Sequence, residues 1–103
     1  MNMKEYLEVK TLIHERSVLH INDPRISDYW TQIVEVLEND EQIMIEVLNK
    51  CTETEIYWLC EIFDDIAFKF PTTKYINTLL EIQKKYPEID MTVDIEFAKK
   101  ALE

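Results

Sequence analysis

The residues with the clearest potential for chemistry are three carboxylates, Glu61, Asp64 and Asp65, spaced at i, i+3 and i+4. On a helix this spacing places them on one face, where two or three carboxylates could converge on a cation. No histidine follows at i+3 or i+4 to complete a Glu-x-x-His motif, and the chain has no glycine for a calcium-binding loop. A general acid would also need a neighbour or burial to raise its pKa. We therefore predict no metal site and no catalytic residues, and we expect that the protein is not an enzyme.

The other residues able to act as nucleophiles or ligands form no recognisable pattern. Cys51 and Cys60 are the two cysteines of the chain, and we expect them to be reduced and packed as small hydrophobic side chains. Neither His14 nor His20 stands near a cysteine or serine in a recognisable nucleophile motif, so packing or capping roles are expected. The absence of glycine excludes the usual glycine-rich dinucleotide and phosphate loops. The sequence therefore predicts no cofactor.

Charge gives the strongest compositional indication of a partner. The 103 residues include 11 basic and 21 acidic side chains, for a formal net charge of −10 at pH 7. Lys50 is the one base in the acidic segment 35–65. Nucleic acid and anionic membranes are disfavoured as direct partners, and the N-terminal segment lacks the apolar run of a signal peptide or membrane span. We expect a cytoplasmic protein with a basic protein partner, although an acidic surface can also serve only to maintain solubility.

These residues must be positioned by helices, because apolar residues recur with a period near 3.6 along most of the chain. The predicted fold is all-α: residues 1–103 form a single domain, either an antiparallel helical bundle or a short stack of helical hairpins, with about six helices. The expected helices cover approximately residues 4–15, 28–39, 41–50, 53–69, 73–86 and 91–102. The expected N-caps are Ser27 or Asp28, then Asp40, Thr52, and Thr72 or Thr73.

The predicted helix 53–69 has two contrasting faces. One is an ordinary apolar core stripe, whereas the other mixes Tyr57, Trp58 and Phe68 with the three carboxylates. Either this helix is central and covered on both sides, or its second face is open and forms a protein interface. In the second case, the predicted partner-binding residues are Glu53, Tyr57, Glu61, Asp64 and Asp65. Tyr57, Glu61 and Asp64 or Asp65 lie one helical turn apart and can form a single ridge. Glu41 and Glu46 join its edge only if the preceding helix packs antiparallel beside it.

Three segments of the C-terminal half carry a family resemblance. They are CTETEIYWLCEIFDDIAFKF, TLLEIQKKYPEID and DIEFAKKAL. Together they resemble the small helical immunity proteins encoded beside bacterial polymorphic toxins, including those of contact-dependent growth inhibition. The resemblance covers residues 51–102, with a weaker echo between Trp30 and Leu48.

The resemblance implies an inhibitor that binds the C-terminal domain of a cognate toxin, often a nuclease, and blocks its active site or substrate groove. The acidic composition agrees with this, because a nuclease must attract phosphate and is usually basic. The alternative is an acidic helical adaptor or regulatory subunit that binds another protein. The sequence does not specify the oligomeric state.

Overall fold

Apolar residues at spacings of three and four form helices along most of the chain. The computed structural model describes residues 3–103, and no strand occurs within that range. The all-α prediction is therefore confirmed for the described residues, with seven helices where about six were expected. In chain order these are α1 (Met3–Ser17), α2 (Ile26–Leu37), α3 (Glu41–Lys50), α4 (Glu53–Leu59), α5 (Phe63–Lys69), α6 (Thr73–Lys85) and α7 (Thr92–Leu102).

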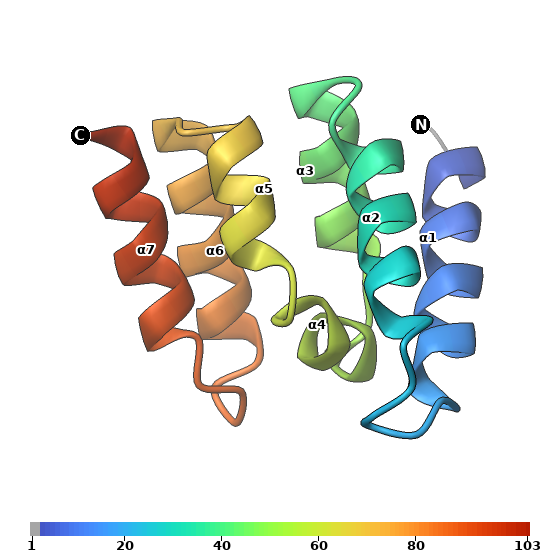
Figure 1. The fold of residues 1–103 in the computed structure, drawn as a ribbon. Coiled ribbons are helices and arrows are strands. Elements are labelled where there is room, and N and C mark those ends of the chain that lie inside the picture. Colours follow the sequence, from blue (N-terminus) through green and yellow to red (C-terminus); the bar gives the residue numbers. More distant parts are fainter. Residues whose placement is uncertain (1–2) are drawn as a thin grey trace.

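Apart from α4, successive helices alternate in direction, and α4 crosses one end of the bundle (Figure 1). Helices α2 and α5 lie next to each other in front of α3 and α6, while α1 and α7 form the two flanks (Figure 1). The N-terminal half, in which α1 packs against α2, α3 and α4, meets the C-terminal half where α3 contacts α6 and α2 contacts α5. The Cα radius of gyration is 12.8 Å, close to the value of about 13 Å typical of a domain of 100 residues.

All seven helices contribute side chains to one apolar core. Its largest enclosed side chains include Leu37, Met44, Phe63 and Tyr75. The Tyr75 hydroxyl donates a hydrogen bond to the backbone carbonyl of Phe63 at 2.8 Å, which satisfies the polar end of this residue inside the core. Each large apolar side chain contributes about 1.5–3 kcal/mol when it is buried. The pair of Phe63 and Tyr75 thereby fixes α5 against α6.

Three of the predicted N-caps are confirmed. The side chains of Asp40, Thr52 and Thr72 each accept a hydrogen bond from the backbone N–H three residues further along. Thr52 and Glu55 form the expected capping box, in which Glu55 also accepts from the backbone N–H of Thr52 at 2.9 Å. Of the two candidates before α6, Thr72 is the cap and Thr73 is the first helical residue.

The predicted cap of the second helix is wrong. Helix α2 begins at Ile26, so Ser27 and Asp28 lie inside its first turn, and no side chain caps it. The turn that precedes it is organised by Asp23, whose carboxylate accepts from the Arg25 backbone N–H at 2.8 Å and pairs with the Arg25 guanidinium. Aspartate commonly forms such local turns, so the chain is already shaped for a helix before Ser27 is reached.

The predicted helix 53–69 is also wrong as a single element, because α4 and α5 are separate helices joined by residues 60–62. The N–H of Glu61 bonds to the Trp58 carbonyl at 3.2 Å, and the N–H of Ile62 bonds to the Leu59 carbonyl at 2.9 Å. These i to i+3 bonds tighten the end of α4 into a 3₁₀ turn, after which the chain restarts as α5. Ile62 is 1% exposed, so the turn is anchored in the core although it contains no glycine or proline.

Candidate partner-binding surface

The aromatic and acidic face of α4 and α5 is open to solvent. Tyr57 is 60% exposed and Phe68 is 70% exposed. Asp64 and Asp65, on the same helix as Phe68, are also exposed. Trp58 alone among the aromatic side chains of this face is half-buried. This face is therefore not covered by the rest of the domain, as the first interpretation required, and its role as an interface stays a prediction.

The predicted single ridge does not exist, because its members lie on different elements. Tyr57 belongs to α4, Glu61 to the turn after it, and Asp64 and Asp65 to the first turn of α5. The ridge required one uninterrupted helix, on which these residues would lie one turn apart. The chain changes direction at the 3₁₀ turn, so α4 and α5 do not share one helix axis (Figure 1).

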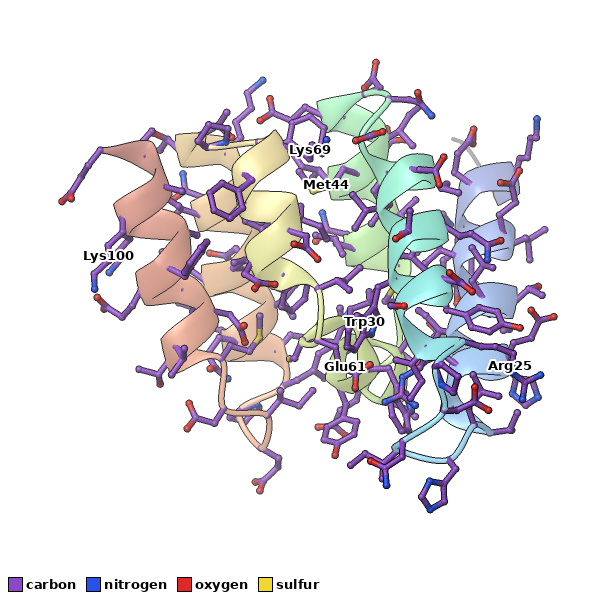
Figure 2. All side chains as sticks on the ribbon, viewed as in Figure 1. Arg25, Trp30, Met44, Glu61, Lys69 and Lys100 are labelled. Atoms are coloured by element: carbon purple, nitrogen blue, oxygen red, sulfur yellow. The ribbon has the colours of Figure 1, made fainter. Side chains whose placement is uncertain are left out.

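Glu61 is exposed, but its carboxylate is held in a cluster of side chains around the buried Arg16. Arg16, only 6% exposed at the end of α1, donates from Nε to Glu61 Oε1 at 2.9 Å and from Nη2 to Oε2 at 2.6 Å. Trp30 Nε1 donates to the same Oε1 at 2.9 Å, and Figure 2 shows these two residues together where α2 approaches the α4–α5 turn. The Arg16 guanidinium also lies 4.8 Å from the ring centroid of Trp58, a cation–π contact. We call Arg16, Trp30, Trp58 and Glu61 the Arg16 cluster.

The electrostatics of the Arg16 cluster favour an ionised Glu61. Partial burial opposes its charge, but the hydrogen bonds from Arg16 and Trp30 outweigh that effect and lower the pKa of the carboxyl. Both carboxylate oxygens are engaged, and the neighbouring guanidinium compensates the charge. Glu61 therefore has little charge left to offer a partner.

Three other predicted residues are dispersed. Glu41 turns toward the start of α6, where its Oε2 accepts from Thr72 Oγ1 at 2.5 Å. Glu46 is half-buried on α3, and Glu53 is exposed at the beginning of α4. Because α3 packs mainly against α1, α2 and α6, the condition for Glu41 and Glu46 to border a ridge on α4 and α5 is not met.

A groove of about 520 Å³ separates α2 from α5. Its apolar side chains are Trp30, Val34 and Phe68, and its charged side chains are Glu35, Glu38, Asp65 and Lys69. We call it the α2–α5 groove. In Figure 2, Trp30 and Lys69 mark its two ends.

An aromatic anchor and unpaired acid charge lie along the α2–α5 groove. The ring of Phe68 packs edge-to-face against Phe97 of α7 with centroids 5.4 Å apart, which holds an otherwise exposed side chain in place. Lys69 Nζ pairs with Glu38 Oε2 at 2.9 Å, so Glu35 and Asp65 are the acids of the groove that form no salt bridge with any described residue.

Asp65 is electrostatically suited to a cationic partner. Partial burial and the adjacent Asp64 raise the pKa of its carboxyl, and Lys69 only partly offsets them. The ionised form is thus less favoured than in an isolated aspartate, and a guanidinium or ammonium group placed beside the carboxylate would stabilise it.

Sequence reasoning selected Asp65 as a partner-binding residue, and it lies in the α2–α5 groove, but the contribution of α2 was missed. Trp30, Val34 and Glu35 belong to the periodic pattern of a helix some thirty residues earlier in the chain. Glu35 is part of the acidic segment 35–65, so its charge could be noted from the sequence. No local sequence pattern predicts that α2 packs beside α5.

Cys51 is buried and Cys60 is half-buried, and both are free thiols. Burial is the main reason that the pKa of each thiol is raised to about 12.

In the described part of the chain, no group of three His, Cys, Asp or Glu residues is placed to hold a metal ion. None of the helices in residues 3–103 has both the length and the apolar character needed to cross a membrane.

Comparison of the chain with protein-family models, curated proteins and solved structures found no match. The resemblance to immunity proteins therefore stays a prediction.

Proposed function

We propose that this protein binds a basic protein partner through the α2–α5 groove, and that it acts as an immunity-type inhibitor of a toxin domain. The observation that carries the proposal is the placement of Phe68 beside Asp65. An exposed aromatic ring that packs against Phe97, next to a carboxylate whose charged form a cation would stabilise, matches the composition of protein-binding hot spots.

The overall charge supports the same partner chemistry. The net charge of −10 steers a basic protein toward the surface and raises the association rate. A nuclease domain is one such partner, because its substrate groove must attract phosphate. An acidic protein that occupies this groove excludes the nucleic acid, and inhibition then requires no chemistry from the inhibitor.

The sequence-predicted residues take different parts in this proposal. Asp65 is central, and Asp64 adds charge at the start of the same helix. Tyr57 and Glu53 are exposed on α4 and extend the surface beyond the groove. Glu61 contributes indirectly, because the Arg16 cluster holds Trp30 at the end of the groove.

The first test uses the toxin domain encoded by the reading frame next to this gene. That domain is expressed in bacteria with and without this chain, and growth is followed together with binding of the two purified proteins. Restored growth and a stable complex are expected. A gene with no neighbouring toxin frame, or a complex that forms without restoring growth, would favour the alternative, an acidic adaptor or regulatory subunit.

The second test locates the interface. Asp65→Lys combined with Phe68→Ala should weaken binding by about 2–5 kcal/mol, since it removes the anchor and reverses the charge. Leu80→Ala combined with Glu81→Lys makes a comparable change on α6, away from the groove, and should leave affinity within about threefold. Equal losses in the two variants would mean that the partner senses net charge and not this groove.

A further inference from the structure

A second groove lies on the opposite side of α2, between α2 and α1. It has a volume of about 550 Å³. Its lining residues are Leu7, Glu8, Thr11 and Leu12 from α1 and Gln32, Glu35 and Val36 from α2. We call it the α1–α2 groove. It is separate from the α2–α5 groove, although Glu35 on the crest of α2 borders both.

The floor of the α1–α2 groove is apolar and only partly covered. Leu7 is 52% exposed, and Leu12 and Val36 are half-buried at the edge of the core. Apolar side chains that stay partly exposed in one groove are a common feature of protein-binding sites. The site therefore offers desolvation energy to an apolar side chain that enters it.

Both walls of this groove carry negative charge. Glu8 stands on α1 and Glu35 on α2, and none of the residues that line the groove is basic. An adjoining hollow shares Glu8 and Glu35 and is also lined by Glu5 and Lys4. One carboxylate oxygen of Glu5 is buried without a hydrogen-bond partner among the described residues. The carboxylates of Glu5, Glu8 and Glu35 thus outnumber the one cation, Lys4, in this hollow. The edge of the α1–α2 groove therefore favours a partner with basic groups.

The surrounding backbone points to a helical occupant. The walls are helices whose backbone groups bond internally, and the described part of the chain has no strand edge to which an extended peptide could add. A helix brings its own backbone hydrogen bonds and presents apolar side chains at i, i+4 and i+7. The groove residues of α1 run from Leu7 to Leu12, roughly 8 Å along the axis, which matches two such anchors.

We propose that the α1–α2 groove docks an amphipathic helix of a partner protein whose apolar stripe is flanked by lysine or arginine. The apolar stripe contacts Leu7, Leu12 and Val36, and the flanking cations meet Glu8 and Glu35. This inference does not depend on toxin inhibition, because it concerns another groove, which shares only Glu35 with the α2–α5 groove.

The probe is a fluorescein-labelled peptide of 18 residues with leucine on one helical face and lysine on the other. Its anisotropy is measured as the full chain is added. Two control peptides accompany it, one with glutamate in place of lysine and one of the same composition without helical periodicity. The proposal expects saturable binding of the first peptide, and at least about tenfold weaker binding of both controls.

Variants of the full chain place the peptide. Leu7→Ala combined with Glu8→Lys should weaken binding at least about tenfold, because it removes one floor contact and reverses one wall charge. Val93→Ala combined with Glu96→Lys makes a matched change at exposed positions of α7 and should alter binding less than about twofold. Circular dichroism confirms that both variants keep the helical fold.

Three outcomes would overturn the proposal. The wild-type chain could fail to bind the leucine–lysine peptide. The two double variants could weaken binding equally, which would show attraction to net charge alone. Lastly, Asp65→Lys with Phe68→Ala could abolish peptide binding while the Leu7 and Glu8 variant retains it, which would place the helix in the α2–α5 groove.

Discussion

Replacing Glu61 by glutamine tests whether the Arg16 cluster stabilises the fold. Glutamine keeps one oxygen to accept from Trp30 but removes the charge that compensates Arg16, whose guanidinium is buried under Trp58. Sequence reasoning placed Glu61 on a surface ridge, where its substitution would barely affect folding. The structure leads to the opposite expectation.

The size of the effect follows from the burial of the two partners. Removing one member of a fully buried ion pair costs about 3–5 kcal/mol, because the other charge is left uncompensated. The side chain of Arg16 is 7% exposed and that of Glu61 29% exposed, so water can reach the carboxylate side and we expect about 2–3 kcal/mol. The urea midpoint should then fall by about 1–2 M.

Urea denaturation followed by circular dichroism measures this change. Arg16→Met added to Glu61→Gln should recover at least half of the loss, because the buried charge disappears and the Met sulfur can still pack on Trp58. Asp65→Asn is the matched control, a carboxylate to amide change at an exposed acid, and should shift stability by less than about 0.5 kcal/mol.

The pH dependence gives an independent readout of the Arg16 cluster. Because the pKa of Glu61 is lowered in the folded state, its contribution is complete above its ordinary pKa of 4.5 and is lost as pH falls through the folded value. The stability gap between wild type and Glu61→Gln should therefore narrow below pH 4.5. A cost under about 0.5 kcal/mol at pH 7, or a gap unchanged by acid, would show that the pair behaves as a solvated surface salt bridge and would refute this reasoning.

Two further predictions concern the caps and the thiols. Thr72→Ala should destabilise the protein by about 1–2 kcal/mol in thermal or urea unfolding, because the Thr72 hydroxyl caps α6 and donates to Glu41. Thr73→Ala should cost under about 0.5 kcal/mol, and equal costs for the two variants would contradict the assigned cap. Because burial raises the pKa of Cys51 and Cys60 to about 12, both thiols should react slowly with Ellman's reagent at pH 8 in the native protein and rapidly in denaturant. The half-buried Cys60 should react before Cys51, and fast labelling of the native protein would contradict their burial.

The helices themselves were largely predictable because their signals act over a few residues. Asp40, Thr52 and Thr72 each satisfy an amide three positions away, so the motif and its structural effect occupy the same short segment. Pro71 and Pro87 likewise end the preceding helices within one or two residues. The misplaced start of α2 shows how such signals fail when a second local motif, the Asp23 turn, acts just before them.

The candidate site was predictable only in part. The sequence singled out the aromatic and acidic residues on the second face of segment 53–69 but left open whether they are covered or exposed. In the structure Asp65 and Phe68 are exposed. The α2–α5 groove also includes Trp30 and Glu35, because α2 packs beside α5. No sequence pattern within either helix encodes that packing.

The sequence alone therefore determined the helical class, most of the helix starts and the excess of negative charge, since periodicity, caps and net charge are local or additive properties. Only the tertiary structure decided which acids remain available to a partner. Arg16 reaches Glu61 across 45 positions and Glu41 meets Thr72 across 31. Such pairings arise when packing brings distant helices within hydrogen-bond distance, and the same packing breaks the segment 53–69 into α4 and α5 and opens the grooves on both sides of α2.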